Sequence, residues 1–218
     1  MTRAVVFDLD GTLIDSLPDM TLSANGLLAE NGLPALQSSQ VAGFVGSGVQ
    51  VFMNRLIAAT ALEPSEYDAL LARFMELYIK ATDHTEVFPH VRDTLEHLRG
   101  AGYALGLCTN KPTAPLTSIL EALDLGKYFE VAVAGDTLAV RKPDPAPLKL
   151  AFQRLGATEG LYVGDSDVDS ETALAADVPF AFFTEGIRTK PVADIPHDAA
   201  FSDFCDLPEL CKTLCRSL

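Results

Sequence analysis

The chain has 218 residues, of which 48% are hydrophobic, and carries a formal net charge of −14. This length allows one domain with a substantial insertion or two small domains, and the negative charge argues against binding to nucleic acids or anionic membranes. No stretch approaches the roughly 18 apolar residues of a membrane span, and the N-terminus does not resemble a cleaved signal peptide, so we expect a cytoplasmic protein.

The cysteines and histidines do not indicate a zinc site. No histidines recur at metal-ligand spacing, Cys-x-x-Cys spacing is absent, and the four cysteines are Cys108, Cys205, Cys211 and Cys215. We therefore expect reduced thiols rather than a disulfide framework, and histidines that serve packing or the surface.

The first predicted element is a strand that ends in two acids. Residues 4–7 form an uninterrupted apolar run, typical of a strand buried on both faces, and Asp8 and Asp10 follow it. Because side chains alternate along a strand, the two carboxylates can start on the same side, and Gly11 then permits a sharp turn. Open α/β sheets bind their ligands at the carboxyl ends of strands, so we expect a site here.

The next segment has a helical pattern. Ser16 and Asp19 resemble a capping box at the start of the first helix. The first predicted helix ends at Asn31–Gly32. A second runs from the glycine-rich turn at 43–48 to about Ala59, and a third covers 67–81 and has one apolar face. Because no strand pattern interrupts residues 16–84, we predict an all-helical cap domain inserted between the first strand and the rest of the chain.

Strands and helices alternate from residue 85 onward. Apolar runs at 103–108, 131–134, 161–163 and 178–183 predict strands, and helical patterns separate them. Asp144 and Pro145 are expected to begin the helix that closes at Gly156. The alternation predicts an α/β fold with a doubly wound, Rossmann-like parallel sheet, formed by residues 1–15 and 85–218.

Polar residues follow four of the predicted strands, and in a parallel sheet these strand ends lie along one edge. The residues are Asp8 and Asp10, Thr109 and Asn110, Lys142, and Asp165 and Asp169. Each motif is weak alone, since Thr109 could simply cap the following helix and Lys142 could be a solvated loop lysine. Their common edge is the stronger indication. Oxygen ligands without Cys or His suit Mg²⁺, which would also offset the repulsion among these carboxylates.

The strand-end motifs resemble those of the haloacid dehalogenase superfamily of phosphatases. The matching strings are FDLDGTLIDS at 7–16, TNKP at 109–112, RKPDP at 141–145 and GDSDVD at 164–169. The resemblance covers the whole chain, and the phosphoglycolate phosphatase group is the most similar. Phe88 and Pro89 fit the return from cap to core, but His90 stands where the family usually has Gly, which leaves the hinge geometry open.

This resemblance implies that Asp8 is the nucleophile and Asp10 the general acid and base. It implies metal ligation by the side chains of Asp8 and Asp165, by the main-chain carbonyl of Asp10, and by Asp169 through water or as a support. Thr109, Asn110 and Lys142 would then contact the phosphoryl group, with Lys142 neutralising its charge.

The substrate-selecting residues are expected in the cap. Between Ser16 and Glu86 the sequence has three cations against eight acids, so recognition of a substrate carboxylate would need a specific position. We favour Arg55, with Gly46 in the turn that faces the core, although Arg55 could also be an ordinary solvated residue. The turn lacks the Lys-Ser/Thr of a nucleotide-binding loop, which disfavours that interpretation.

The resemblance favours Mg²⁺-dependent hydrolysis of a small phosphorylated metabolite, foremost 2-phosphoglycolate to glycolate and phosphate through an aspartyl-phosphate intermediate. Asp10 argues against dehalogenases and phosphonatases. A phosphosugar mutase, a pyrophosphatase or a broad-specificity phosphatase of sugar phosphates or nucleotides stays open. A more distant alternative is a non-catalytic protein that binds a phosphorylated effector. The protein would be a monomer or a homodimer.

Overall fold

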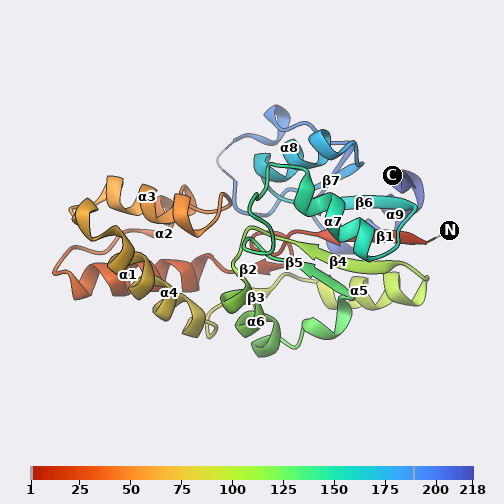
Figure 1. Ribbon diagram of the computed structural model, residues 1–218. Helices are drawn as coiled ribbons and strands as arrows, with labels where there is room; N and C mark the ends of the chain where they lie inside the picture. Colours follow the sequence, from red (N-terminus) through yellow and green to blue (C-terminus); the bar gives the residue numbers. More distant parts are fainter. Residues whose placement is uncertain (1, 189) are drawn as a thin grey trace.

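The computed structural model describes residues 2–188 and 190–218, and its centre is a largely parallel sheet (Figure 1). The main strands are β1 (Arg3–Phe7), β4 (Ala104–Cys108), β5 (Val131–Val133), β6 (Glu159–Gly164), β7 (Phe180–Phe183) and β8 (Ala199–Phe201). They lie in the order β5-β4-β1-β6-β7-β8, and the short β9 (Arg216–Ser217) pairs antiparallel with β6. The chain therefore reverses direction across the sheet beside β1, as in doubly wound dinucleotide-binding folds. The predicted parallel sheet is confirmed.

Helices cover both faces of this sheet. One face carries α5 (Val91–Gly100), α6 (Thr113–Ala122) and α9 (Leu207–Leu214), and the other carries α7 (Ala146–Arg154) and α8 (Asp167–Ala176). Side chains of β1 alternate between the two apolar clusters: Val5 and Phe7 pack into one, Ala4 and Val6 into the other. The strand is thus buried on both faces, as its apolar run predicts.

A helical segment, residues 16–84, lies beyond the carboxyl ends of the strands, at the end of the molecule remote from both chain termini (Figure 1). It contains α1 (Leu17–Glu30), α2 (Ser38–Ala42), α3 (Val49–Ala59) and α4 (Tyr67–Lys80), and all of its residues are described, with no strand among them. Its helices share an apolar cluster of their own. The short antiparallel strands β2 (Ile14–Asp15) and β3 (Glu86–Val87) flank it as a two-stranded hinge.

The structure corrects one local expectation in this segment. Ser16 precedes α1, but its side chain makes no capping hydrogen bond, so the predicted capping box is wrong. The Asp19 carboxylate instead accepts hydrogen bonds from the His84 backbone, 3.0 Å, and from the Thr85 hydroxyl, 2.6 Å. Asp19 therefore ties the start of the helical segment to its end.

Several short elements were not predicted. They are α2, the hinge strands, β8, α9, β9 and the 3₁₀ turns Pro64–Glu66, Gly126–Tyr128, Val192–Asp194 and Phe204–Asp206. None of the helices among the described residues combines the length and apolar character needed to cross a bilayer.

His90, at the return from the helical segment, adopts a left-handed conformation with φ of 62°. A Cβ is disfavoured in this conformation, so the position would suit Gly better than His. The His90 Nδ1 atom lies 2.8 Å from Asp203 Oδ1, so a side-chain contact accompanies the unusual backbone.

Candidate active site

Three buried carboxylates meet at the carboxyl edge of the sheet. Asp8 follows β1, Asp165 follows β6, and Asp169 lies in the first turn of α8. One oxygen from each lies within 4.8 Å of the others. The cluster sits beside β1 and β6, where the sheet topology switches direction, which is the ligand position expected of this architecture.

Asp8 is the least satisfied member of the cluster. Its Oδ1 atom is buried and lies 3.0 Å from Lys142 Nζ, yet no described group donates a hydrogen bond to it in good geometry. Burial raises the pKa of Asp8 to about 7, although Lys142 counteracts the rise. A buried oxygen without a donor is available to a metal ion or to an electrophile.

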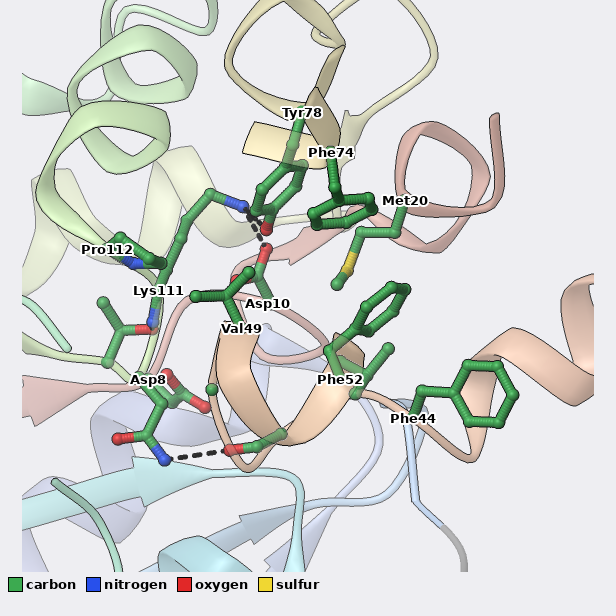
Figure 2. A pocket seen from close by; sticks show the side chains of 15 residues that line it. Asp8, Asp10, Met20, Phe44, Val49, Phe52, Phe74, Tyr78, Lys111 and Pro112 are labelled. Atoms are coloured by element: carbon green, nitrogen blue, oxygen red, sulfur yellow. Dashed lines mark hydrogen bonds and ion pairs between the residues drawn. The ribbon is translucent and has the colours of Figure 1, made fainter. Parts of the chain in front are cut away.

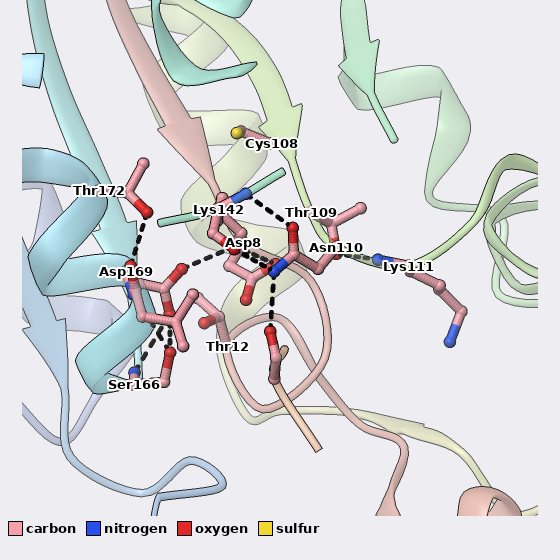
Figure 3. A network of polar contacts seen from close by, with 12 residues as sticks. Asp8, Thr12, Cys108, Thr109, Asn110, Lys111, Lys142, Ser166, Asp169 and Thr172 are labelled. Atoms are coloured by element: carbon pink, nitrogen blue, oxygen red, sulfur yellow. Dashed lines mark hydrogen bonds and ion pairs between the residues drawn. The ribbon is translucent and has the colours of Figure 1, made fainter. Parts of the chain in front are cut away.

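Asp169 holds Lys142 in place (Figure 3). Its Oδ1 atom accepts hydrogen bonds from Lys142 Nζ and from the Tyr162 hydroxyl, each at 2.7 Å. Its Oδ2 atom accepts one from the Ser166 hydroxyl at 2.6 Å. Burial opposes ionisation of Asp169, but Lys142 lowers its pKa below the usual value. Both oxygens are thus committed to orienting neighbouring groups.

Asp165 is held from two directions. Its Oδ1 atom accepts a hydrogen bond of 2.6 Å from the Thr12 hydroxyl, and its Oδ2 atom accepts one of 2.7 Å from the Ile187 backbone. Burial and the nearby carboxylates raise the pKa of Asp165 well above its usual value. Gly11 has φ of 83°, and a Cβ there would overlap the Asp165 carboxylate. Only glycine lets the β1 turn approach so closely.

Two residues after β4 contribute polar groups: Thr109 has a hydroxyl, and the Asn110 side chain holds two loops together by hydrogen bonds. The Thr109 hydroxyl oxygen accepts a hydrogen bond from the Lys111 backbone, 3.2 Å, and still has its own hydrogen to donate. The Asn110 amide donates to the carbonyl oxygens of Gly46 and Lys142, each at 3.0 Å, and its oxygen accepts from the Lys142 backbone. Both amide hydrogens are therefore occupied. In this arrangement Asn110 positions the Lys142 loop and the glycine-rich turn, and its contact with a phosphoryl group stays a prediction.

The donor set fits a hard divalent cation. The cluster offers carboxylate oxygens without sulfur or imidazole, and the unpartnered Asp8 Oδ1 atom lies within it. Asp8 and Asp165 are the side chains that could bind such an ion. Asp169 is already engaged by Lys142, Tyr162 and Ser166, so it fits the supporting role that the sequence left as one alternative.

A pocket extends from Asp8 and Asp10 to the helical segment (Figure 2). Its lining from the core comprises Asp8, Asp10, Thr109, Asn110, Lys111 and Pro112, and its lining from the helical segment comprises Met20, Phe44, Val45, Gly46, Gly48, Val49, Phe52, Phe74 and Tyr78. Gly46 therefore faces the site, as predicted. The wall opposite the carboxylates is largely apolar.

Sequence reasoning missed Lys111 and Tyr78. The Lys111 ammonium donates to Asp10 Oδ1 at 3.0 Å and to the Tyr78 hydroxyl. Burial would lower the pKa of Lys111, but Asp10 and Tyr78 raise it, while burial raises the pKa of Tyr78 to about 12. The pair therefore stays as ammonium and neutral phenol. Lys111 stood inside a recognised string without a role, and Tyr78 was placed only on an apolar helix face.

Arg55 does not take the position expected of it. Its guanidinium is exposed, donates to the backbone carbonyls of Gly43 and Phe44 at 3.2 and 3.4 Å, and is not among the described residues that line the pocket. The glycine-rich turn thus uses Arg55 for its own support. The basic residue that does reach the pocket is Lys111, from the core.

Comparisons with known proteins agree with this geometry. The model of the haloacid dehalogenase-like hydrolase family matches residues 5–183. A phosphoglycolate phosphatase of Cereibacter sphaeroides is 43% identical over 96% of this chain and 98% of its own length, and one of Rhodospirillum rubrum is 42% identical over 95% and 90%. The crystal structure of a predicted phosphoglycolate phosphatase from Haemophilus somnus superimposes with a TM-score of 0.91 at 32% identity, covering 96% of this chain and 97% of the other. The chain belongs to the haloacid dehalogenase-like hydrolase family.

Proposed function

We propose that this protein is a Mg²⁺-dependent phosphatase that hydrolyses 2-phosphoglycolate to glycolate and phosphate. The observation that carries the proposal is the Asp8 carboxylate, which lines the core side of the pocket and whose buried Oδ1 atom accepts no hydrogen bond from a described group but lies 3.0 Å from the ammonium of Lys142. A nucleophile, a fixed cation and a second acid, Asp10, are thereby available to one bound phosphoryl group.

The reaction needs two carboxylates with different tasks. An Asp8 oxygen attacks phosphorus while the bond from phosphorus to the glycolate oxygen breaks, and Asp10 gives its proton to that oxygen. Asp10 then takes a proton from water as the water attacks the phosphorus of the aspartyl phosphate, which releases phosphate and restores Asp8. Lys142 and the Thr109 hydroxyl stabilise charge on the transferring oxygens.

A Mg²⁺ ion held by Asp8, Asp165 and the main-chain carbonyl of Asp10 would offset the repulsion between these acids and the phosphate. The supporting observation is the all-oxygen cluster, in which burial and neighbouring acids raise the pKa values of Asp8 and Asp165. Asp169 would support the site by fixing Lys142.

The pocket lies between the core and the helical segment, and largely apolar side chains line it on the side of the helical segment. The choice of 2-phosphoglycolate is supported by two relatives that match over nearly the whole chain and are named phosphoglycolate phosphatases. We assign residues 16–84 as a cap that closes the pocket over the core.

The test is phosphate release from a panel of phosphoesters with Mg²⁺ present: 2-phosphoglycolate, glucose 6-phosphate, pyrophosphate and a nucleoside monophosphate. We expect the highest kcat/KM with 2-phosphoglycolate, no activity after exhaustive chelation, and recovery on adding Mg²⁺. Conversion of glucose 1-phosphate to the 6-phosphate without phosphate release would indicate a mutase instead. Full activity after chelation would refute the metal assignment.

A further inference from the structure

We propose that Lys111 binds the carboxylate of the substrate and so selects carboxylated phosphoesters, an inference that rests on the proposed function. The sequence predicts that a residue of the helical segment binds the substrate carboxylate, but the basic residue that lines the pocket in the structure, Lys111, belongs to the core. The chemistry recognised is a small phosphoester with a second anionic group about two carbons from the ester oxygen.

The position of Lys111 suits this role. The residue is 6% exposed and lines the pocket next to Asp10 and Tyr78 (Figure 2). Its Nζ atom lies 4.3 Å from the centre of the Tyr78 ring and donates to Asp10 Oδ1 and to the Tyr78 hydroxyl. An ammonium has three N–H donors. Among the described residues two of them are used, which leaves one donor for a ligand in the pocket.

Other cations near the pocket are committed elsewhere. Arg73 is paired with Glu30 at 2.7 Å and with Glu76, on the outside of α4. Arg55 supports the glycine-rich turn, and Arg141 donates to the Gln50 side chain without lining the pocket. Lys111 is thus the one basic residue among the described residues that line this pocket.

Among the described residues, the opposite wall offers a carboxylate no charged side chain of opposite sign. Met20, Phe52 and Phe74 form an apolar surface there, and Asp8 and Asp10 add negative charge at the core side. A desolvated carboxylate is costly unless a charged donor pairs with it. The Lys111 ammonium, with its remaining donor, meets this need at the place where the helical segment and the core face each other.

The decisive experiment compares two substrates that differ only at the second functional group. For wild type and Lys111→Met, kcat/KM is measured with 2-phosphoglycolate and with 2-hydroxyethyl phosphate, which carries a neutral hydroxyl in place of the carboxylate. We expect Lys111→Met to lose about 10- to 100-fold more activity on 2-phosphoglycolate, the range that a charged hydrogen bond supplies. Arg55→Met, which removes a cation outside the pocket, should leave the ratio of the two substrates unchanged. Equal losses on both substrates in Lys111→Met would overturn the inference.

A binding measurement covers the case in which Lys111→Met folds poorly. Calorimetric titration of the wild-type protein with Mg²⁺ present compares 3-phosphonopropionate, a non-hydrolysable analogue of 2-phosphoglycolate, with propylphosphonate, which lacks the carboxylate. We expect about 10- to 100-fold tighter binding of the carboxylated compound, and equal affinities would overturn the inference. If this preference is found but no phosphoester is hydrolysed, the proposed function fails and the inference stands. If phosphoesters are hydrolysed but the carboxylated compound binds no more tightly, the proposed function stands and the inference fails.

Discussion

The carboxyl edge of the sheet and the helical segment that faces it differ in where their charged side chains lie. At the edge, buried charges lie in contact: Lys142 is 2.7 Å from Asp169 and 3.0 Å from Asp8, and all three side chains are buried. The helical segment turns an apolar surface to the pocket and keeps Arg73 paired with Glu30 at its exterior. The comparison leads us to propose that the core performs the chemistry, whereas the boundary between the two regions selects the substrate.

The largest effect is expected from Asp8→Asn. The amide is nearly isosteric but cannot attack phosphorus, so phosphate release should fall by about 10⁴-fold or more, as when other enzymes lose their nucleophile. Thermal unfolding followed by circular dichroism should show that the protein still folds. Activity within about tenfold of wild type would show that the core edge does not work as proposed.

Asp10→Asn should have the next largest effect. Loss of a general acid and base costs roughly 10² to 10⁴ in rate, and kcat with 2-phosphoglycolate measures it. A substrate with a leaving group that needs no proton, such as p-nitrophenyl phosphate, is the control, because its first step should suffer less. A similar loss of the phosphoenzyme-forming step with both leaving groups would remove Asp10 as the acid.

Substitutions of the two remaining acids of the cluster should impair different properties, Mg²⁺ binding in one case and kcat and stability in the other. Asp165→Ala is expected to weaken Mg²⁺ binding by at least about tenfold, since a direct ligand is removed. Asp169→Ala should act mainly on kcat and stability, because the buried ammonium of Lys142 loses its 2.7 Å partner and keeps only Asp8 at 3.0 Å. The cost should stay below the roughly 3–5 kcal/mol of a buried charge left without any partner. Titration of Mg²⁺ with each variant checks this. Equal losses of affinity would make Asp169 a direct ligand.

Metal-free protein should lose stability as the pH rises. The folded state raises the pKa of Asp8 from 3.8 to about 7, so it holds this proton more tightly than the unfolded chain does. The stability contributed is therefore present below about pH 4 and is lost towards pH 7, by at most about 4 kcal/mol at ~1.4 kcal/mol per pKa unit. Urea unfolding between pH 5 and 8 measures it. Asp8→Asn should make the slope smaller without abolishing it, because the pKa of Asp165 is raised as well, and saturating Mg²⁺ should flatten the dependence. A slope of opposite sign would contradict the cause.

The smallest effect is expected at the hinge. His90→Gly relieves the strain of the left-handed backbone, which stabilises the fold. It also loses the exposed contact with Asp203 and makes the unfolded chain more flexible, and both effects destabilise the fold. The free energy of unfolding should therefore stay within about 1 kcal/mol of wild type. His90→Ala keeps the Cβ and loses the same contact. It should therefore be less stable than His90→Gly by about 1 kcal/mol. The reverse order would show that the backbone strain is unimportant.

The core was predictable because its signals are local. The apolar run of β1 is interrupted at Asp8, and similar endings at Thr109 and Asp165 identify the sheet edge without knowledge of the fold. The alternation of strands and helices then brings those ends together. The parallel sheet, the all-helical character of residues 16–84 and the meeting of Asp8, Lys142 and Asp165 could thus be inferred from order alone.

The missed features depend on contacts between distant residues. Lys111 and Tyr78 are 33 positions apart, and only packing of α4 against the core joins them. The hydrogen bonds of Asn110 and Asp19 were missed for the same reason, because their side chains satisfy backbone groups at Gly46 and His84. The strands β8 and β9 are too short for a periodic pattern, so the sequence carries little signal for them.

The central claim is that Asp8 becomes phosphorylated, and direct mapping of the labelled residue tests it. Wild-type protein is mixed with phosphorus-labelled 2-phosphoglycolate and Mg²⁺, quenched in acid within the first turnover, digested and sequenced by mass spectrometry, with Asp8→Asn as the control. We predict label on Asp8 in the wild-type protein and none on the variant. Label on a different residue would contradict the account. So would an Asp8→Asn variant that releases phosphate in the first turnover as fast as the wild-type protein does.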